Sequence, residues 1–172
     1  MEYKASLDNL AKIITAGTII LFLVLGYGSI SALSLSKGDF TVLFIQASTL
    51  FAFIAIILGC YLFAPQSYIM DNSDLIIVRP IKNKKIKLAE IAEIRAVADG
   101  DMIGAIRTFG VGGLFGYFGK FYSFKIGSMM FYATRRNNKI LIITNQDQKI
   151  IITPDDISMI EKLKEKLIQK SK

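Results

Sequence analysis

Two long apolar runs near the start of the sequence limit what this chain can fold into more than any other feature. Residues 13–36 and 40–70 contain no charged side chain, and a short break holding Lys37 and Asp39 separates them. A helix needs about 20 apolar residues to cross the hydrocarbon core of a bilayer. Only helices and closed barrels satisfy their backbone hydrogen bonds there. The sequence therefore predicts a two-helix transmembrane hairpin over residues 13–64, with spans at 13–35 and 41–64.

The segments around and within this hairpin give further expectations. In residues 1–12, Tyr3, Leu7 and Leu10 recur at helical spacing, which predicts a short amphipathic lead lying in the membrane interface. Small residues on both spans, Gly28 and Gly59 among them, predict surfaces through which the two helices approach each other closely.

The first apolar run also has some features of a signal peptide. Ser29 and Ser31 are small enough for a cleavage site, but Glu2 and Asp8 replace the positive charge that normally precedes the apolar part of a signal peptide. The run is also long for a signal peptide, so a retained membrane span is favoured.

Net charge is distributed unevenly along the chain. The three basic and three acidic residues before residue 64 cancel, so the whole net charge of +7 follows the hairpin. Basic residues close to a span end favour the cytoplasmic side, and Arg79, Lys82 and Lys84 follow the second span. Because two spans return the chain to its starting side, both termini are predicted to be cytoplasmic.

The basic residues after the hairpin are candidates for contact with anionic phospholipid. Each Lys or Arg near an anionic cytoplasmic leaflet is worth about 1 kcal/mol. Lys85 and Lys87 are predicted to share one strand face, opposite Ile86 and Leu88. A solvated surface explains the same charges equally well, and nucleic acid is disfavoured because no nucleic-acid motif is present. The candidate lipid-binding residues are Lys82, Lys84, Lys85, Lys87, Arg135 and Arg136.

After residue 65 the pattern changes to short apolar runs of period two, separated by turn residues. Residues 89–97 fit a strand and a helical turn alike. Thr153, Pro154 and two acids predict a C-terminal amphipathic helix over 154–170 that covers the sheet. The last three strands are predicted to pair antiparallel in sequence order. Strands are predicted at 68–70, 75–78, 84–88, 129–134, 139–144 and 149–153.

Glycine and aromatic residues alternate over residues 107–122 at a density that is unusual for a strand. One interpretation is a wedge that enters the lipid headgroup region or contacts a partner, because glycine frees the backbone and aromatic rings favour the membrane interface. In the other, Phe115 and Phe118 fill the domain core and the glycines form a bulged crossing. The sequence leaves both open. The candidate contact residues are Phe109, Gly112, Gly113, Phe115, Gly116, Tyr117 and Phe118.

Motifs for catalysis, cofactors and metals are poorly represented. Histidine is absent, and Cys60, in the second span, is the sole cysteine, so acid–base chemistry would depend on carboxylates such as Asp155. Phe115 stands where a dinucleotide fingerprint requires glycine, and Phe121 where a phosphate loop requires Ser or Thr. A turn at Asp101 offers too few oxygen ligands for a cation. We therefore predict a non-enzymatic protein without cofactor or metal.

The order of elements resembles that of a pleckstrin-homology (PH)-like domain, a bent, partly open barrel closed at one corner by a C-terminal helix. The runs at residues 109–119, 132–135 and 153–156 are similar to those of bacterial PH-domain proteins with an N-terminal membrane hairpin. The resemblance covers residues 65–172 and, with the hairpin, nearly the whole chain. It implies a fold that combines a membrane α-helical hairpin with a mainly-β, PH-like partly open barrel.

The same resemblance implies a membrane-associated binding module, in a group of proteins that generally lacks an assigned activity. Residues 71–74 form an acidic first turn where phosphoinositide-binding relatives carry basic residues, and the final helix has no Trp. Both features argue against phosphoinositide recognition. The prediction is a multi-pass adaptor of the bacterial inner membrane that holds a protein partner or anionic headgroups. The alternative is an accessory or regulatory subunit of a larger membrane complex, contacted through the hairpin.

Overall fold

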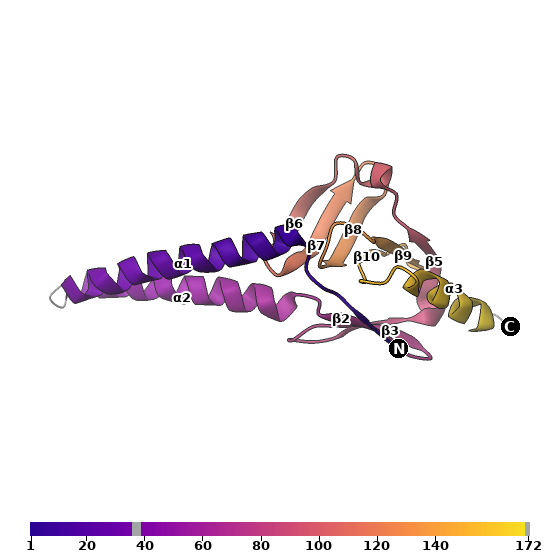
Figure 1. The fold of residues 1–172 in the computed structure, drawn as a ribbon, viewed down its shortest axis with the longest axis horizontal. Helices are drawn as coiled ribbons and strands as arrows, with labels where there is room; N and C mark the ends of the chain where they lie inside the picture. Colours follow the sequence, from indigo (N-terminus) through magenta and orange to yellow (C-terminus); the bar gives the residue numbers. More distant parts are fainter. Residues whose placement is uncertain (36–38, 171–172) are drawn as a thin grey trace.

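The computed structural model describes residues 1–35 and 39–170, so the predicted break at Lys37 lies outside the described residues. Helices α1 (Asn9–Leu35) and α2 (Phe40–Phe63) form a hairpin that projects from a mainly-β domain (Figure 1). Both helices are long and apolar enough to cross a membrane. The side chain of Asp39 caps α2 by accepting a hydrogen bond from the Thr41 backbone N–H at 2.8 Å, which supplies a partner to a group that the helix itself leaves unpaired.

The two helices meet through different residues from those that the sequence predicts. The rings of Phe22 and Phe53 stack with their centroids 4.4 Å apart, and Leu50 packs beside Gly26. A Cβ atom placed on Gly28 or Gly59 would meet nothing within 4 Å. The small-residue prediction is therefore wrong for these two glycines, because larger apolar side chains form the contact elsewhere on the helices.

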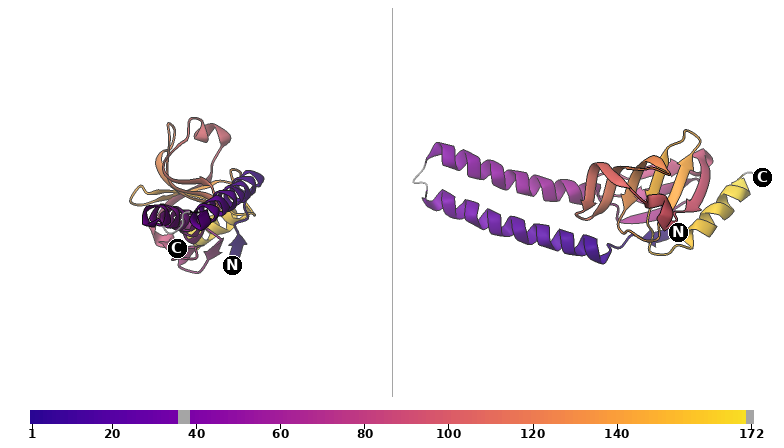
Figure 2. Two further views of the ribbon diagram at one scale, coloured as in Figure 1. Left: turned by 90° about the vertical axis from the view of Figure 1, so that its left-hand side faces the viewer. Right: turned by 90° about the horizontal axis from the view of Figure 1, so that it is seen from above.

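The domain consists of two sheets that do not close into a continuous barrel, with helix α3 (Met159–Lys170) on the side away from the hairpin (Figure 2). The first sheet has the order β1-β2-β3-β4 and is antiparallel, with strands β1 (Glu2–Lys4), β2 (Ser67–Met70), β3 (Asp74–Val78) and β4 (Lys84–Lys87). The second has the order β5-β9-β10-β8-β7-β6, with strands β5 (Ile91–Ala96), β6 (Ile106–Gly113), β7 (Gly116–Ser123), β8 (Gly127–Ala133), β9 (Ile140–Thr144) and β10 (Lys149–Ile152). This is the partly open PH-like barrel that the sequence predicts.

The core lies between the two sheets and under α3. Leu75 of β3 and Ile142 of β9 are fully buried in it, and so is Leu163 of α3. The ambiguous stretch at residues 89–97 contains both expected conformations in succession. A 3₁₀ turn, η1 (Leu88–Glu90), leads directly into β5. A second 3₁₀ turn, η2 (Asp99–Met102), follows β5.

The structure differs from the prediction for residues 1–12. Residues 2–4 form strand β1, which pairs antiparallel with β2, and α1 begins at Asn9. Tyr3 is 7% exposed and belongs to the domain core, whereas Glu2 and Lys4 are exposed. The segment also fits period two, and pairing with β2 satisfies backbone groups that a short helix would leave free. The β domain therefore includes the N-terminus as well as the predicted residues 65–172.

The predicted antiparallel pairing of the last three strands in sequence order is confirmed for β9 and β10 and wrong for β8 and β9. Strand β10 lies between β9 and β8, antiparallel to β9 and parallel to β8. Ile150, Ile151 and Ile152 are all buried. A strand that is apolar on both faces is suited to a central position, and this explains why β10 inserts between β9 and β8.

The C-terminal helix begins five residues later than predicted, at Met159. The residues expected to cap it at Thr153 and Asp155 have other partners. Thr153 Oγ1 accepts a hydrogen bond from the Thr134 N–H at 2.9 Å, and the Asp155 carboxylate accepts one from the Ser6 N–H at 2.8 Å. Tertiary contacts therefore occupy Thr153 and Asp155, whereas Asp156 caps the turn before α3 by accepting a hydrogen bond from the Ser158 N–H at 2.9 Å.

Candidate functional site

The turn between β6 and β7 attaches the domain to both helices of the hairpin. Thr15 Oγ1 of α1 accepts a hydrogen bond from the Phe115 N–H at 2.9 Å and donates one to the Gly113 carbonyl at 3.3 Å. The ring of Phe115 meets Tyr61 of α2 edge-on, with centroids 5.6 Å apart. Together these contacts hold the sheet in one position against the hairpin.

The backbone of this turn depends on its glycine. Gly113 has φ +126°, and a Cβ there would lie 2.5 Å from Ile14 Cδ1 of α1. Phe115 has φ +56° although it is not glycine. Such a conformation costs free energy and persists only where surrounding contacts hold it. The contacts with Thr15 and Tyr61 supply this restraint.

The aromatic residues of the glycine- and aromatic-rich segment 107–122 lie in three different environments. Phe118 is buried at 7% exposure, Phe115 is half-buried against α2, and Phe109 is 77% exposed on β6. Neither interpretation from the sequence covers all of them. The turn packs against the hairpin, Phe118 lies among the side chains of the sheet, and Phe109 forms open surface.

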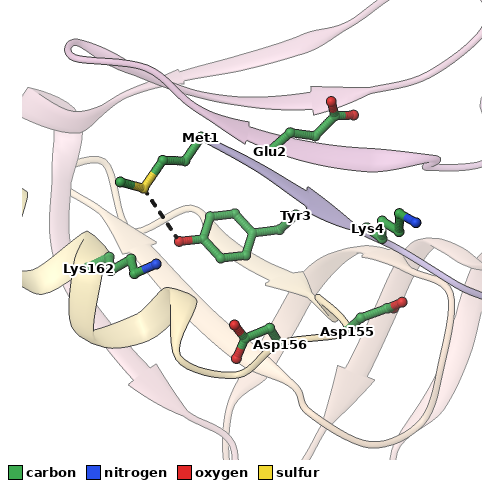
Figure 3. A pocket seen from close by; sticks show the side chains of 7 residues that line it. All are labelled: Met1, Glu2, Tyr3, Lys4, Asp155, Asp156 and Lys162. Carbon is green, nitrogen blue, oxygen red and sulfur yellow. Dashed lines mark hydrogen bonds between the residues drawn. The ribbon is translucent and has the colours of Figure 1, made fainter.

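Two arginines of the predicted lipid-binding set hold the segment that precedes α1. Arg135 donates hydrogen bonds to the Ser6 carbonyl and pairs with Asp155. Arg136 pairs with Asp8 at 3.2 Å. Figure 3 shows Asp155 and Asp156 next to the N-terminal strand, with Lys162 on α3 facing Tyr3. Intramolecular pairing therefore accounts for both arginines.

These contacts lower the pKa of two carboxyl groups. Burial alone would raise the pKa of Asp8, but hydrogen bonds from the Ala11 N–H, Arg136 and Tyr117 lower it overall. Burial likewise opposes the lowered pKa of Asp155, where hydrogen bonds from Ser6 and the charge of Arg135 prevail. The pKa of Tyr117 rises to about 12 because of burial and the neighbouring charge of Asp8.

Because of these pKa shifts, the stability of the folded chain depends on pH in the acid range. A carboxyl group whose pKa is lower in the folded chain adds stability above its unfolded pKa of about 3.9 and loses it as the pH falls through the folded pKa. We expect the midpoint temperature of thermal unfolding to decrease when the pH is lowered below 4. The Asp155→Asn variant should show a smaller decrease. Circular dichroism of the full chain in detergent between pH 3 and 7 measures both. Exposed Asp147 provides the control variant Asp147→Asn, and equal acid sensitivity in both variants would contradict the assignment.

The two turns at opposite ends of the first sheet differ in charge. The β3–β4 turn lies beside α2, where the Ile81 N–H donates to the Leu62 carbonyl at 3.1 Å. This turn carries Arg79 and Lys82. The acidic β2–β3 turn lies at the opposite end, where Lys166 of α3 donates to the Asp71 carbonyl at 2.9 Å. We call these the hairpin end and the distal end of the domain.

The lysines of β4 are spread along the first sheet between the hairpin end and the distal end. Lys85 and Lys87 share an exposed face while Ile86 is buried, as predicted. Lys85 pairs with Ile76 in the middle of β3, whereas Lys87 pairs with Asp74 at the distal end of that strand and forms an ion pair with Glu90 at 3.3 Å. Lys84 points to the other face and lines a hollow of about 450 Å³ beside Met130.

The structure also brings together basic residues that the sequence analysis did not connect. A hollow of about 910 Å³, here called the junction groove, lies between the end of α2 and one face of β6, β7 and β8. Its basic residues are Arg79, Arg107 and Lys120. The strand pairing sets Lys120 opposite Phe109 on one side and Met130 on the other. The sequence analysis could not connect these residues, because only the pairing of β6 with β7 and the positions of α2 and the β3–β4 turn bring them to one groove.

The fold and these features define a class of protein, in which a PH-like β domain is joined to a hairpin of two long apolar helices. A family model described as a bacterial PH domain matches residues 66–171, and the chain belongs to this family. Comparison with curated proteins and with solved structures found no match. PH-like domains are generally non-catalytic binding modules, which agrees with the binding role inferred from the sequence.

Proposed function

We propose that this chain is a membrane-anchored, non-enzymatic binding module of the bacterial inner membrane. The hairpin spans the bilayer, both termini are cytoplasmic, and the domain holds anionic lipid headgroups at the cytoplasmic surface. The observation that supports this proposal is the position of the basic β3–β4 turn beside the end of α2. The basic β3–β4 turn adjoins α2, whereas the acidic β2–β3 turn lies at the distal end.

This arrangement suits an anionic leaflet. Basic residues flanking a span favour the cytoplasmic side, and a negative surface potential attracts them within about 10 Å of the headgroups. Lys82 and Lys85 are exposed and have no ion-pair partner among the described residues. They are therefore the residues of the predicted lipid-binding set that best suit this function, together with Lys84.

Stability in bilayers of defined charge tests the proposal. The full chain is placed in nanodiscs of phosphatidylcholine alone or of phosphatidylcholine mixed with phosphatidylglycerol. We expect the anionic discs to raise the midpoint of thermal unfolding, and added salt to reduce this gain through screening. Lys82→Glu with Lys85→Glu should remove most of the gain, because each lysine near the surface contributes about 1 kcal/mol.

The matched control is Lys162→Glu with Lys164→Glu on α3, which changes the charge equally on the side of the domain away from the hairpin (Figure 1). This variant should keep the gain in anionic discs. Equal loss of the gain in the two variants, or no gain with the unaltered chain, would contradict headgroup binding by the hairpin end.

A protein partner is the second candidate, favoured by apolar side chains on the surface. Ile103 is 72% exposed and Phe124 is 81% exposed. They lie at the ends of β6 and β7 that are remote from the docked β6–β7 turn. Photocrosslinking in native membranes separates the possibilities. Capture from Phe124 favours an adaptor, whereas capture only from lipid-exposed positions such as Phe44 of α2 favours an accessory subunit contacted through the hairpin.

A further inference from the structure

The junction groove combines an apolar floor with positive charge at its edge. Val111, Phe118 and Met130 face it from three adjacent strands. Arg79, Arg107 and Lys120 are its charged residues, and no acidic residue lines it in the described part of the chain. Its volume of about 910 Å³ lies within the range of pockets that bind small molecules and cofactors.

The three basic side chains have no carboxylate partner within residues 1–35 and 39–170. None of them forms an ion pair with a described residue. The guanidinium of Arg79 lies 5.3 Å from the centre of the Tyr132 ring, and its Nε donates to the Lys82 carbonyl at 3.0 Å. These contacts orient Arg79 without neutralising its charge. Guanidinium groups held in this way are well suited to pair with phosphate.

Arg107 extends along its own strand toward the hairpin end. A Cβ placed on Gly112 would lie 2.7 Å from Arg107 Nη1, so glycine at residue 112 leaves room for the guanidinium. Gly112 was predicted to contact the membrane or a partner, and here its lack of a side chain accommodates Arg107. The positive charge is thereby placed near the end of α2 that helps to form the groove.

The groove is continuous with the apolar surface of the hairpin. Gly59 and Phe63 of α2 form one wall. Phe63 is 47% exposed, and a Cβ on Gly59 would meet no atom within 4 Å. Apolar residues of α2 therefore border the groove on the side of the hairpin, where an acyl chain lying along α2 would enter it.

We propose that the junction groove binds one anionic phospholipid, with an acyl chain on the apolar floor and the phosphate between Arg107, Lys120 and Arg79. The inference rests on the proposed membrane anchoring and names a specific ligand site within that function. A ligand with both an apolar chain and a negative headgroup matches both parts of the groove. A zwitterionic lipid would bring its own cation beside the three basic residues, and a free phosphate would leave the apolar floor exposed.

Native mass spectrometry of the full chain in mild detergent tests the site. We expect the chain to retain one phosphatidylglycerol about tenfold more strongly than phosphatidylcholine. Both lipids carry a phosphate, but in phosphatidylcholine the choline cation compensates its charge and is repelled by the basic side chains. Arg107→Gln with Lys120→Gln should abolish this preference. The control Lys125→Gln with Lys164→Gln removes equal charge away from the groove and should keep the preference. Equal retention of both lipids, or a preference that survives in the groove variant, would overturn the proposal.

A second variant tests the path of the acyl chain. Gly59→Leu places a side chain in open space on the α2 wall, so folding should be preserved, and retention of phosphatidylglycerol should fall about tenfold. Unchanged retention in this variant would refute the placement of the chain. Complete displacement of the lipid by inorganic phosphate would show that the site recognises the headgroup alone, and a bound polypeptide in place of lipid would also overturn the proposal.

The two proposals fail in different ways. Loss of the retained lipid together with a persistent stability gain in anionic nanodiscs would reject the groove and leave surface binding by Lys82 and Lys85 intact. If phosphatidylglycerol is retained but the stability gain in anionic nanodiscs does not depend on Lys82 and Lys85, surface binding is rejected and the groove is kept.

Discussion

Replacing Gly119 by alanine is expected to lower the free energy of unfolding by about 3 kcal/mol. Gly119 has φ +117°, and a Cβ there would overlap the Phe109 carbonyl oxygen and lie 2.7 Å from Gly110 Cα on the paired strand. Both atoms belong to backbone, so no side-chain movement relieves the contact. The β6–β7 hairpin, which carries the turn docked on α1 and α2, would have to separate.

Chemical denaturation of the full chain in detergent, followed by circular dichroism and tyrosine fluorescence, measures this change. Gly100→Ala is the matched control, because its Cβ would lie 3.5 Å from the flexible end of Lys125 and its φ is not positive. The control should change stability by less than about 0.5 kcal/mol. If Gly119→Ala were as stable as the control, β6 and β7 could not pair as described.

Replacing Tyr68 by phenylalanine is the other substitution with a large expected effect. Tyr68 is fully buried on β2. Its hydroxyl donates to the Tyr132 carbonyl at 2.6 Å and accepts from the Thr153 N–H at 3.2 Å. Loss of the hydroxyl leaves two backbone groups unpaired between the sheets, and each unsatisfied buried group costs about 1–3 kcal/mol. We expect a total loss of about 3 kcal/mol in the free energy of unfolding.

The same denaturation measurement applies to this variant, with Tyr122→Phe as the control. Tyr122 is 40% exposed, so loss of its hydroxyl should have little effect. Burial raises the pKa of Tyr68 to about 12, and the phenol should therefore show no titration in the folded chain up to pH 10. Titration of all tyrosines together near pH 10 would contradict the buried position of Tyr68.

Much of this architecture is predictable from local sequence patterns. The apolar runs predict α1 and α2 because their length and composition suit no other element. The alternation of Lys85, Ile86 and Lys87 predicts which face of β4 is buried. The family resemblance of residues 65–172 adds the type of domain, and the family match bears this out.

The candidate site was less predictable because its residues are distant in the sequence. Arg79, Arg107 and Lys120 lie on three separate segments, and only the pairing of β6 with β7 and the position of α2 bring them to one groove. Arg135 and Arg136 appeared free for lipid contact, since their carboxylate partners, Asp155 and Asp8, are remote in sequence. Charge alone does not reveal which basic residues are already paired.

Local patterns in the sequence are sufficient to specify two long apolar helices, strands of period two and a helix with one apolar face. The tertiary structure alone decided that residues 2–4 pair with β2, that β10 lies between β9 and β8, and that Asp155 binds Ser6 and Arg135 in place of capping α3. The physical reason is that backbone hydrogen bonds and charges take whichever partners the folded chain brings close, and the short segments concerned gain more from those partners than from local structure.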